Sequence, residues 1–282
     1  MIVVVILTLM WHISQHVFMG ANMTKGNFKA ALAVTLKHEG GWADHPRDPG
    51  GATMKGITLA TFKRYKPNAN RDDLRAISDA DVERIYRDGY WKPVNADLLQ
   101  PGVDLAVFDF GVNSGTGRAA RHLQAVAGAK QDGVIGIKSI GAVDAMRGDV
   151  VVQKLCARRL SFVRALKTWD VFGKGWSRRI ADIEARGVSM WLAVNATPAG
   201  RKMALEDEAD RASKTAGAQS KGAGAAGGAG AAGGATDVAM DPSMLLIGAA
   251  VLVVVGGLLF LKARANRERA AAYRVVASEV VA

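Results

Sequence analysis

The amino-acid sequence predicts a mainly α-helical protein with one small β-hairpin near Thr53, followed by a flexible linker and a C-terminal transmembrane helix. Apolar residues recur with helical spacing through much of residues 27–195, a pattern typical of amphipathic helices. Residues 212–235 consist almost entirely of Ala and Gly, a composition that cannot bury a core. Residues 244–261 carry no charge, and as a helix they are long enough to cross most of a bilayer core.

Length and composition restrict the chemistry. A chain of 282 residues has room for one or two domains with a buried core. The formal charge of +11 favours an anionic partner, and nucleic acid, an acidic cell-wall polymer or a lipid surface would each satisfy it. Nucleic acid is not expected, because neither an aromatic-interleaved RNA motif nor a recognisable DNA-reading motif is present. Cys156 is the only cysteine, so neither an intramolecular disulfide nor a Cys-based metal site can form.

Residues 1–23 form a weak hydrophobic N-terminal segment. No Lys or Arg precedes its apolar run, and no clear small-residue cleavage site follows it. Two interpretations therefore stay open. The segment is either a poor signal or signal-anchor sequence, or upstream sequence ahead of a natural start at Met19 or Met23.

The predicted elements then follow in chain order. A helix should begin at Asn27, its N-cap, and end at the Gly40-Gly41 pair. After a loop rich in Gly and Pro, residues 53–58 should form a short hairpin. Residues 103–112 should form a buried helix, with Asp109 hydrogen-bonded inside the core. Further helical segments are predicted at residues 59–65, 79–91, 118–126 and 139–146.

The candidate active site centres on Glu39, which should lie in the last turn of the first helix. The negative end of the helix dipole disfavours a carboxylate there, so a functional role for Glu39 is more plausible than a stabilising one. Glycoside hydrolysis needs an acid that protonates the leaving oxygen, and commonly a second polar group that holds water or stabilises positive charge. Glu39 with Asp48 and Thr53 could supply these groups, and Trp42 could raise the pKa of the acid by desolvating it.

Each of these residues also has an ordinary explanation. Asp48 before Pro49 suits a turn, and Thr53 suits a strand. Asp44 remains a rival second carboxylate. His38-Glu39 begins like a zinc-protease helix, but Trp42 stands where the second histidine is needed, so no metal is expected. No organic cofactor is expected either.

The string His38-Glu39-Gly40-Gly41-Trp42, with Asp48-Pro49-Gly50-Gly51-Ala52-Thr53 and Gly56-Ile57-Thr58, resembles glycoside hydrolase family 108. That family contains lysozyme-like N-acetylmuramidases of phages and bacteria. The resemblance implies a lysozyme-like helical domain in which Glu39 is the catalytic acid. It also implies peptidoglycan as the substrate, cleavage of the β-1,4 bond after N-acetylmuramic acid, and an endolysin of phage or prophage origin. One departure is Trp42, where the family often has Tyr. The other is Thr53, which comes one residue earlier than in the Glu–Asp–Thr spacing of phage lysozymes of the wider superfamily.

A later set of motifs resembles the predicted peptidoglycan-binding domain that usually follows this hydrolase. Accordingly, residues 24–113 are assigned to the catalytic domain and residues 114–200 to a helical peptidoglycan-binding region. The motifs are Asn113-Ser114-Gly115, Leu123-Gln124, Asp132-Gly133-Val134-Ile135-Gly136 and Phe172-Gly173-Lys174-Gly175-Trp176-Ser177-Arg178-Arg179. The candidate substrate-binding residues are Trp42, Asp44, Trp91 and Asn113.

The C-terminal part of the sequence, residues 201–282, predicts a membrane anchor. Residues 201–241 form the predicted Ala/Gly-rich linker, residues 242–261 the transmembrane helix and residues 262–282 a basic tail. The positive-inside rule places this tail in the cytoplasm and the catalytic domain on the periplasmic or cell-wall side. Two alternatives to a hydrolase stay open, a lytic transglycosylase acting on the same bond and an inactive, membrane-anchored cell-wall-binding protein. The sequence does not indicate an oligomeric state.

Overall fold

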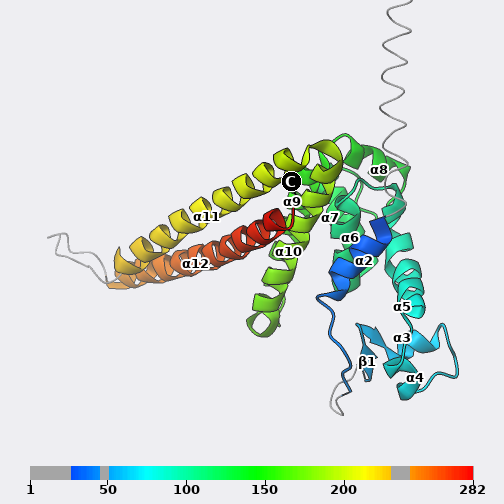
Figure 1. The fold of residues 1–282 in the computed structure, drawn as a ribbon. Coiled ribbons are helices and arrows are strands. Elements are labelled where there is room, and N and C mark those ends of the chain that lie inside the picture. The colour runs from blue at the N-terminus through cyan, green and yellow to red at the C-terminus, as the bar shows by residue number, and fades with distance from the viewer. Residues whose placement is uncertain (1–26, 45–50, 230–241, 282) are drawn as a thin grey trace, which may run out of the picture. The chain divides into compact units, whose positions relative to one another are not determined.

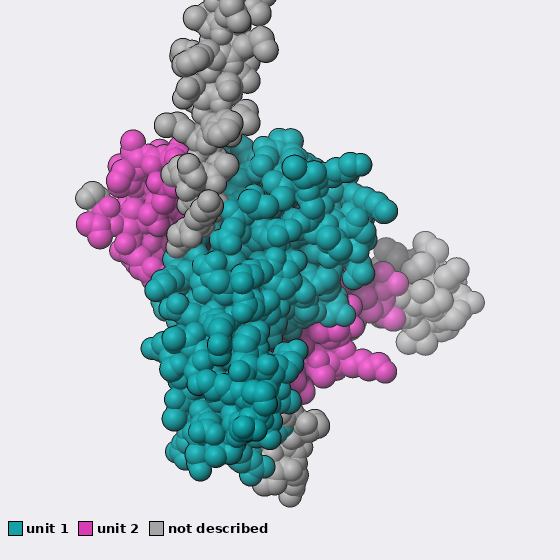
Figure 2. Space-filling model, turned by 90° about the vertical axis from the view of Figure 1, so that its right-hand side faces the viewer, with its two compact units in different colours: residues 1–162 teal, residues 163–282 magenta. Residues whose placement is uncertain are grey.

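A computed structural model describes residues 27–44, 51–229 and 242–281. These residues form a mainly helical fold with one two-stranded antiparallel sheet, as the sequence predicts. The N-terminal segment 1–23 lies outside the described residues. The chain divides into two compact units, residues 1–162 and 163–282, which Figure 2 shows in different colours.

The first unit contains the hairpin and most of the short helices. Figure 1 shows β1, α3 and α4 grouped together below α5, while α2, α6 and α7 lie above them. The elements are α2 (Asn27–Leu36), β1 (Thr53–Met54), β2 (Ile57–Thr58), α3 (Leu59–Lys63), α4 (Arg71–Arg75), α5 (Asp79–Tyr86), the π-helical turn η1 (Arg87–Trp91), the 3-10 turns η2 (Lys92–Val94) and η3 (Ala96–Leu98), α6 (Val103–Ser114), α7 (Thr116–Ala127), α8 (Ile137–Asp144) and α9 (Gly148–Arg164).

Helix α6 forms the centre of the first unit and is buried along most of its length. Phe108 on this helix meets Trp91 edge to face, with ring centroids 5.4 Å apart, and Trp91 meets Phe28 of α2 in the same way at 5.3 Å. Edge-to-face contacts are a favoured arrangement of buried aromatic rings. Helix α2 is therefore fixed to the core by its first turn, and this position determines where its C-terminal end points.

Two acids lie inside the core of the first unit. Asp109 accepts a 2.6 Å hydrogen bond from Nη1 of Arg159 on α9, so the predicted buried aspartate belongs to a buried ion pair. Asp104 accepts hydrogen bonds from the backbone N–H groups of Gly102 and Leu105 and from Asn27. Burial nevertheless raises the pKa of Asp104 to about 6, because a charged carboxylate is poorly solvated there.

The second unit consists of three long helices, α10 (Trp169–Asn195), α11 (Pro198–Ala229) and α12 (Pro242–Ser278). Helices α11 and α12 run side by side (Figure 1), and α12 also packs against α10. The prediction of a flexible linker over residues 201–241 is wrong for its first part, because residues up to 229 continue α11. Residues 230–241 lie outside the described residues.

Small side chains explain why the Ala-rich stretch forms a helix. Alanine has the highest helix propensity, and a small side chain lets a neighbouring helix approach closely. Ala212 and Ala216 of α11 are buried. A Cβ added to Gly256 of α12 would lie 3.6 Å from the carbonyl oxygen of Ala223 in α11, which is ordinary contact distance. The Ala and Gly residues thus form a helix-helix contact, although they cannot fill a conventional core.

The transmembrane prediction for residues 242–261 is corrected by the structure. Within the described parts of the chain, no helix is both long enough and apolar enough to span a bilayer. The apolar residues instead form the first half of the 37-residue helix α12. The predicted membrane anchoring, with the catalytic domain on the cell-wall side and the C-terminus in the cytoplasm, depended on that segment and is corrected with it.

The predicted basic tail is folded onto α10 as the second half of α12. Arg269 donates two hydrogen bonds to Oε1 of the buried Glu184, at 2.9 and 2.6 Å, and the Tyr273 hydroxyl donates a third at 3.1 Å. Near the end of the chain, Arg186 forms a two-point ion pair with Glu279 at 2.9 and 3.1 Å. The charges of this segment therefore stabilise the second unit.

Candidate functional site

The end of α2 carries Glu39 away from the core toward the hairpin. Helix α2 ends at Leu36, and the backbone N–H groups of His38 and Glu39 continue its turn by donating to the carbonyls of Thr35 and Leu36, at 3.0 and 3.2 Å. The side chain of Glu39 is half-buried. A carboxylate on a short extension of a core-anchored helix is held in place, but it remains accessible to a ligand.

The hairpin turn packs directly against the carboxylate of Glu39. Both turn residues have positive φ, 49° at Lys55 and 73° at Gly56, as a tight two-residue hairpin requires. A Cβ added to Gly56 would lie 2.7 Å from Oε2 of Glu39 and 2.7 Å from the hydroxyl oxygen of Tyr86. Only glycine therefore suits this position, for its backbone conformation and for the space that the carboxylate occupies.

Two tyrosines from α5 and the following π-helical turn complete the surroundings of Glu39. The hydroxyl of Tyr86 donates a 2.7 Å hydrogen bond to the carbonyl of Lys55, which fixes the turn against the acid. Tyr90 lies beside Tyr86, with ring centroids 5.6 Å apart. Burial raises the pKa of Tyr90, and the negative charge of Glu39 raises it further, although Arg64 acts in the opposite direction. Tyr90 therefore keeps its proton near neutral pH and can donate a hydrogen bond.

The hairpin holds Thr53 in the same part of the unit. Thr53 pairs with Thr58 across the hairpin and with Ala43 on its other side, where the two N–O distances are 2.9 and 2.8 Å. Its hydroxyl donates to the carbonyl of Gly51 at 3.2 Å. The chain segment after Glu39 is therefore joined to β1 by an isolated β-bridge. Asp48 lies outside the described residues.

Two further predicted residues face arginines of α4. The ring of Trp42 is half-buried, and the guanidinium of Arg75 lies 5.7 Å from its centroid. Asp44 forms a 3.6 Å ion pair with Arg71. Both residues lie on the segment that joins Glu39 to the hairpin.

The structure separates the other two predicted substrate-binding residues from this group. Trp91 exposes 0% of its surface and packs between Phe28 and Phe108, so its ring is part of the core. Asn113 is exposed near the C-terminal end of α6, where its side-chain oxygen accepts a 3.0 Å hydrogen bond from the hydroxyl of Ser114. Neither residue contributes to the surroundings of Glu39 described above.

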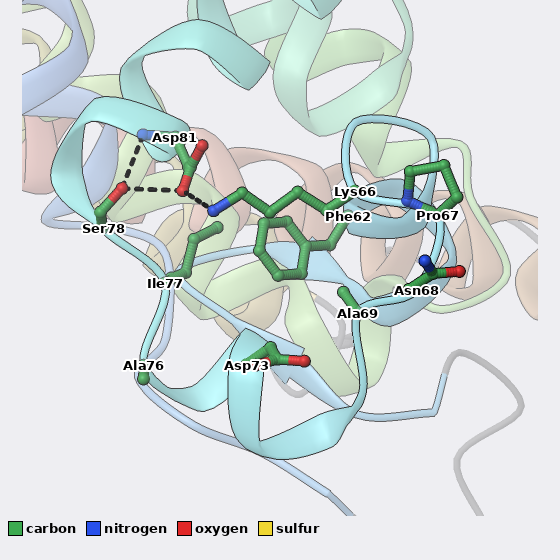
Figure 3. A pocket seen from close by; sticks show the side chains of 10 residues that line it. All are labelled: Phe62, Lys66, Pro67, Asn68, Ala69, Asp73, Ala76, Ile77, Ser78 and Asp81. Atoms are coloured by element: carbon green, nitrogen blue, oxygen red, sulfur yellow. Dashed lines mark hydrogen bonds and ion pairs between the residues drawn. The ribbon is translucent and has the colours of Figure 1, made fainter.

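A cavity of about 510 Å³ lies among α3, α4 and α5 (Figure 3). Lys66 and Ser78 both reach Asp81 on its wall, at 2.7 and 2.8 Å. The hydrogen bond from Lys66 is the main reason that the pKa of Asp81 is lowered. This ion pair offsets the charges of Lys66 and Asp81, and Asp73 is a further acid on the wall. Glu39 is not among the lining residues, so the cavity is not the site of that acid.

Sequence reasoning missed Tyr86, Tyr90 and Arg64. The signal for the tyrosines was their spacing of four, which places two phenol rings on one face of a helical segment. Nothing local to residues 86–90 indicates that this face meets the turn at Gly56, because that contact joins distant parts of the chain.

As for metals, no group of three or more His, Cys, Asp or Glu side chains in the described ranges could hold an ion.

Comparison with known proteins relates the chain to one family and to solved structures. Residues 32–115 match the glycosyl hydrolase 108 family, and this range contains Glu39, the hairpin and both tyrosines. The solved structure of SagA from Brucella abortus is 41% identical to the chain, with a TM-score of 0.54. That likeness covers 59% of this chain and 97% of the SagA chain. None of the curated proteins matches this chain.

Proposed function

Because this chain belongs to the glycosyl hydrolase 108 family, we propose that it is a peptidoglycan hydrolase that uses Glu39 as its general acid. Family membership indicates a glycoside hydrolase of the lysozyme-like type. The finer part of the proposal is the bond, the β-1,4 linkage between N-acetylmuramic acid and N-acetylglucosamine. The observation that supports it most is the carboxylate of Glu39, held against a glycine turn beside two tyrosines.

In the proposed reaction, protonated Glu39 donates its proton to the glycosidic oxygen as the bond to C1 breaks. Positive charge then develops on the ring oxygen and C1, and water adds to C1 and releases a proton, which gives a reducing end and allows Glu39 to be protonated again. Thr53 and Asp48 are proposed to position this water or stabilise the positive charge. Asp44 is the less suitable second carboxylate, because it already lies 3.6 Å from Arg71.

The aromatic and backbone groups around the acid have proposed roles of their own. Tyr86 is a positioning residue, since it holds the turn that contacts Glu39. Tyr90 keeps its proton and could donate a hydrogen bond to a sugar hydroxyl or amide. Trp42 offers an aromatic face for a sugar ring, with Arg75 beside it.

Mass spectrometry of purified sacculi after digestion tests this proposal. A hydrolase adds water and leaves N-acetylmuramic acid at the new reducing end. A lytic transglycosylase uses the same acid but closes the 6-hydroxyl onto C1, so each product is lighter by one water. If anhydro-muramyl ends are the main product, the protein is a lytic transglycosylase and the hydrolase proposal is wrong. Absence of any cleavage would favour a protein that only binds the cell wall.

A further inference from the structure

A second cavity in the first unit, about 420 Å³ in volume, has no part in the proposed chemistry at Glu39. It lies where the α6–α7 junction, the loop after α7 and helix α9 meet. Four of its lining side chains are basic, namely Arg118, Arg121, His122 and Arg158. Ser114 and Gln131 also line it, and none of its lining residues is acidic.

The arginines of this cavity keep their charges available. Arg118 donates to the backbone carbonyl of Ser114 at 2.8 Å, and Arg121 donates to that of Gly117 at 3.5 Å. Within residues 27–44, 51–229 and 242–281, none of Arg118, Arg121 and Arg158 forms an ion pair. All three are exposed, so the cavity combines uncompensated positive charge with access from solvent.

The loop that carries the Asp132-Gly133 motif positions Arg121. Buried Gln124 accepts a 3.0 Å hydrogen bond from the N–H of Gly133 and donates one of 2.8 Å to Asp132. Asp132, the nearest acid in sequence to Gln131, therefore already accepts hydrogen bonds from Gln124 and from the N–H of Val134. Gly133 has a φ of +85°, and a Cβ there would lie 3.1 Å from Cζ of Arg121. The glycine thus lets the loop pack against the guanidinium and restrict its position.

Two phenylalanine rings that are not among the lining residues support His122, the remaining basic group of the cavity. His122 packs against Phe110 and Phe162, with ring centroids 5.1 and 5.8 Å away, and Arg118 lies over Phe162 at 4.7 Å. Burial lowers the pKa of His122, and the charges of Arg158 and Arg118 lower it further. At neutral pH the imidazole is therefore uncharged and adds a hydrogen-bonding group beside the three guanidinium groups.

We propose that this cavity binds carboxylates of the peptide stems of peptidoglycan, and so holds the polymer that the Glu39 site cuts. The inference rests on the proposed function, which supplies the polymer. A guanidinium group presents two parallel N–H donors that match a carboxylate, and three such groups suit a peptide with more than one free carboxylate. The cavity volume is within the range of sites for small ligands.

The test measures binding of a purified disaccharide-peptide with free carboxylates to the full chain carrying Glu39→Gln, so that no cleavage occurs. Isothermal titration should show that Arg121→Gln with Arg158→Gln weakens binding at least about tenfold. Lys154→Gln is the matched control, because it removes an exposed charge from α9 outside the cavity and should leave binding unchanged. Gly133→Ala, which keeps every charge but displaces Arg121, should weaken binding as well.

Two further ligands identify the source of the anion. The same disaccharide-peptide with amidated carboxylates should bind weakly to the chain that keeps both arginines. Its affinity there should equal that of the free-carboxylate peptide for the Arg121→Gln, Arg158→Gln variant. If inorganic phosphate competes with the peptide at equal concentration, the cavity is a general anion site and the assignment is wrong. Unchanged binding of the peptide by a folded Arg121→Gln, Arg158→Gln variant would also overturn the assignment. Hydrolysis of sacculi by the unmodified chain is scored separately, so that loss of the proposed function and loss of this cavity's role are distinguishable.

Discussion

Replacing Gly56 with alanine should displace Glu39, the proposed catalytic acid, while leaving its chemistry intact. The added Cβ would lie 2.7 Å from Oε2 of Glu39 and 3.1 Å from its Cδ. Non-bonded heavy atoms favour separations of about 3.5 Å, so the carboxylate or the turn must move by roughly 0.8 Å. Misplacement of a reacting group by about 1 Å can lower the rate about 100-fold. We therefore expect kcat on purified peptidoglycan to fall about 100-fold in Gly56→Ala.

The same substitution also has a backbone cost that must be separated from the displacement. An alanine in the left-handed region costs roughly 1–2 kcal/mol of stability. Gly128→Ala is the matched control, because its φ is +69° and an added Cβ would meet no atom within 4 Å. Both variants should lose the backbone share of stability by urea unfolding, and Gly56→Ala should lose more because its Cβ also meets Glu39 and Tyr86. Only Gly56→Ala should lose activity. If the two variants retain equal activity, the carboxylate of Glu39 is not where the reaction requires it.

Two further predictions concern the acids buried in the first unit. Burial raises the pKa of Asp104 to about 6, so the native state binds the carboxyl proton more tightly than the unfolded state does. The stability that this proton contributes is therefore lost as the pH rises from about 4 through 6. Urea unfolding at pH 4 and pH 7 should show a loss of about 2 kcal/mol from this group, absent in Asp104→Asn. Equal pH dependence in both proteins would refute the assignment. Asp109→Ala leaves the buried Arg159 without its partner and should destabilise the unit by about 3–5 kcal/mol, whereas Asp109→Leu with Arg159→Met should recover most of that loss. Thermal unfolding of the single and double variants checks this, and a double variant as unstable as the single one would contradict it.

The sequence was sufficient where a feature depends on neighbouring residues. Helix α2, the hairpin at 53–58 and the buried helix α6 each have a local pattern that predicts them, and the structure confirms all three. Glu39 was expected in the last turn of this helix, whereas α2 ends at Leu36 and Glu39 lies in the turn just after it. Tyr86 was not assigned to the site, because its role depends on a contact with Lys55, 31 residues earlier in the chain.

The two errors in the C-terminal third have a common physical origin. Hydropathy and composition describe a segment alone, whereas α11 and α12 are long helices that pack against one another. A run of Ala and Gly lacks the volume for a core, yet it suits the close approach seen at Gly256. The basic residues after 261 were assigned to a tail, but Arg269 pairs with Glu184 on α10. Such partners are visible only in the folded unit.

The central claim is most directly tested by digesting purified sacculi with the unmodified chain and with Glu39→Gln. Two quantities are measured for each protein, the reducing ends that it releases and the amount of it that pellets with the sacculi. Glutamine keeps the shape of the side chain but cannot donate the proton, so cleavage should fall at least about 100-fold, within the range attributed to general acid catalysis. The amount of pelleted protein should stay the same in both. A Glu39→Gln protein that releases reducing ends at the unmodified rate would contradict the assignment of Glu39 as the catalytic acid.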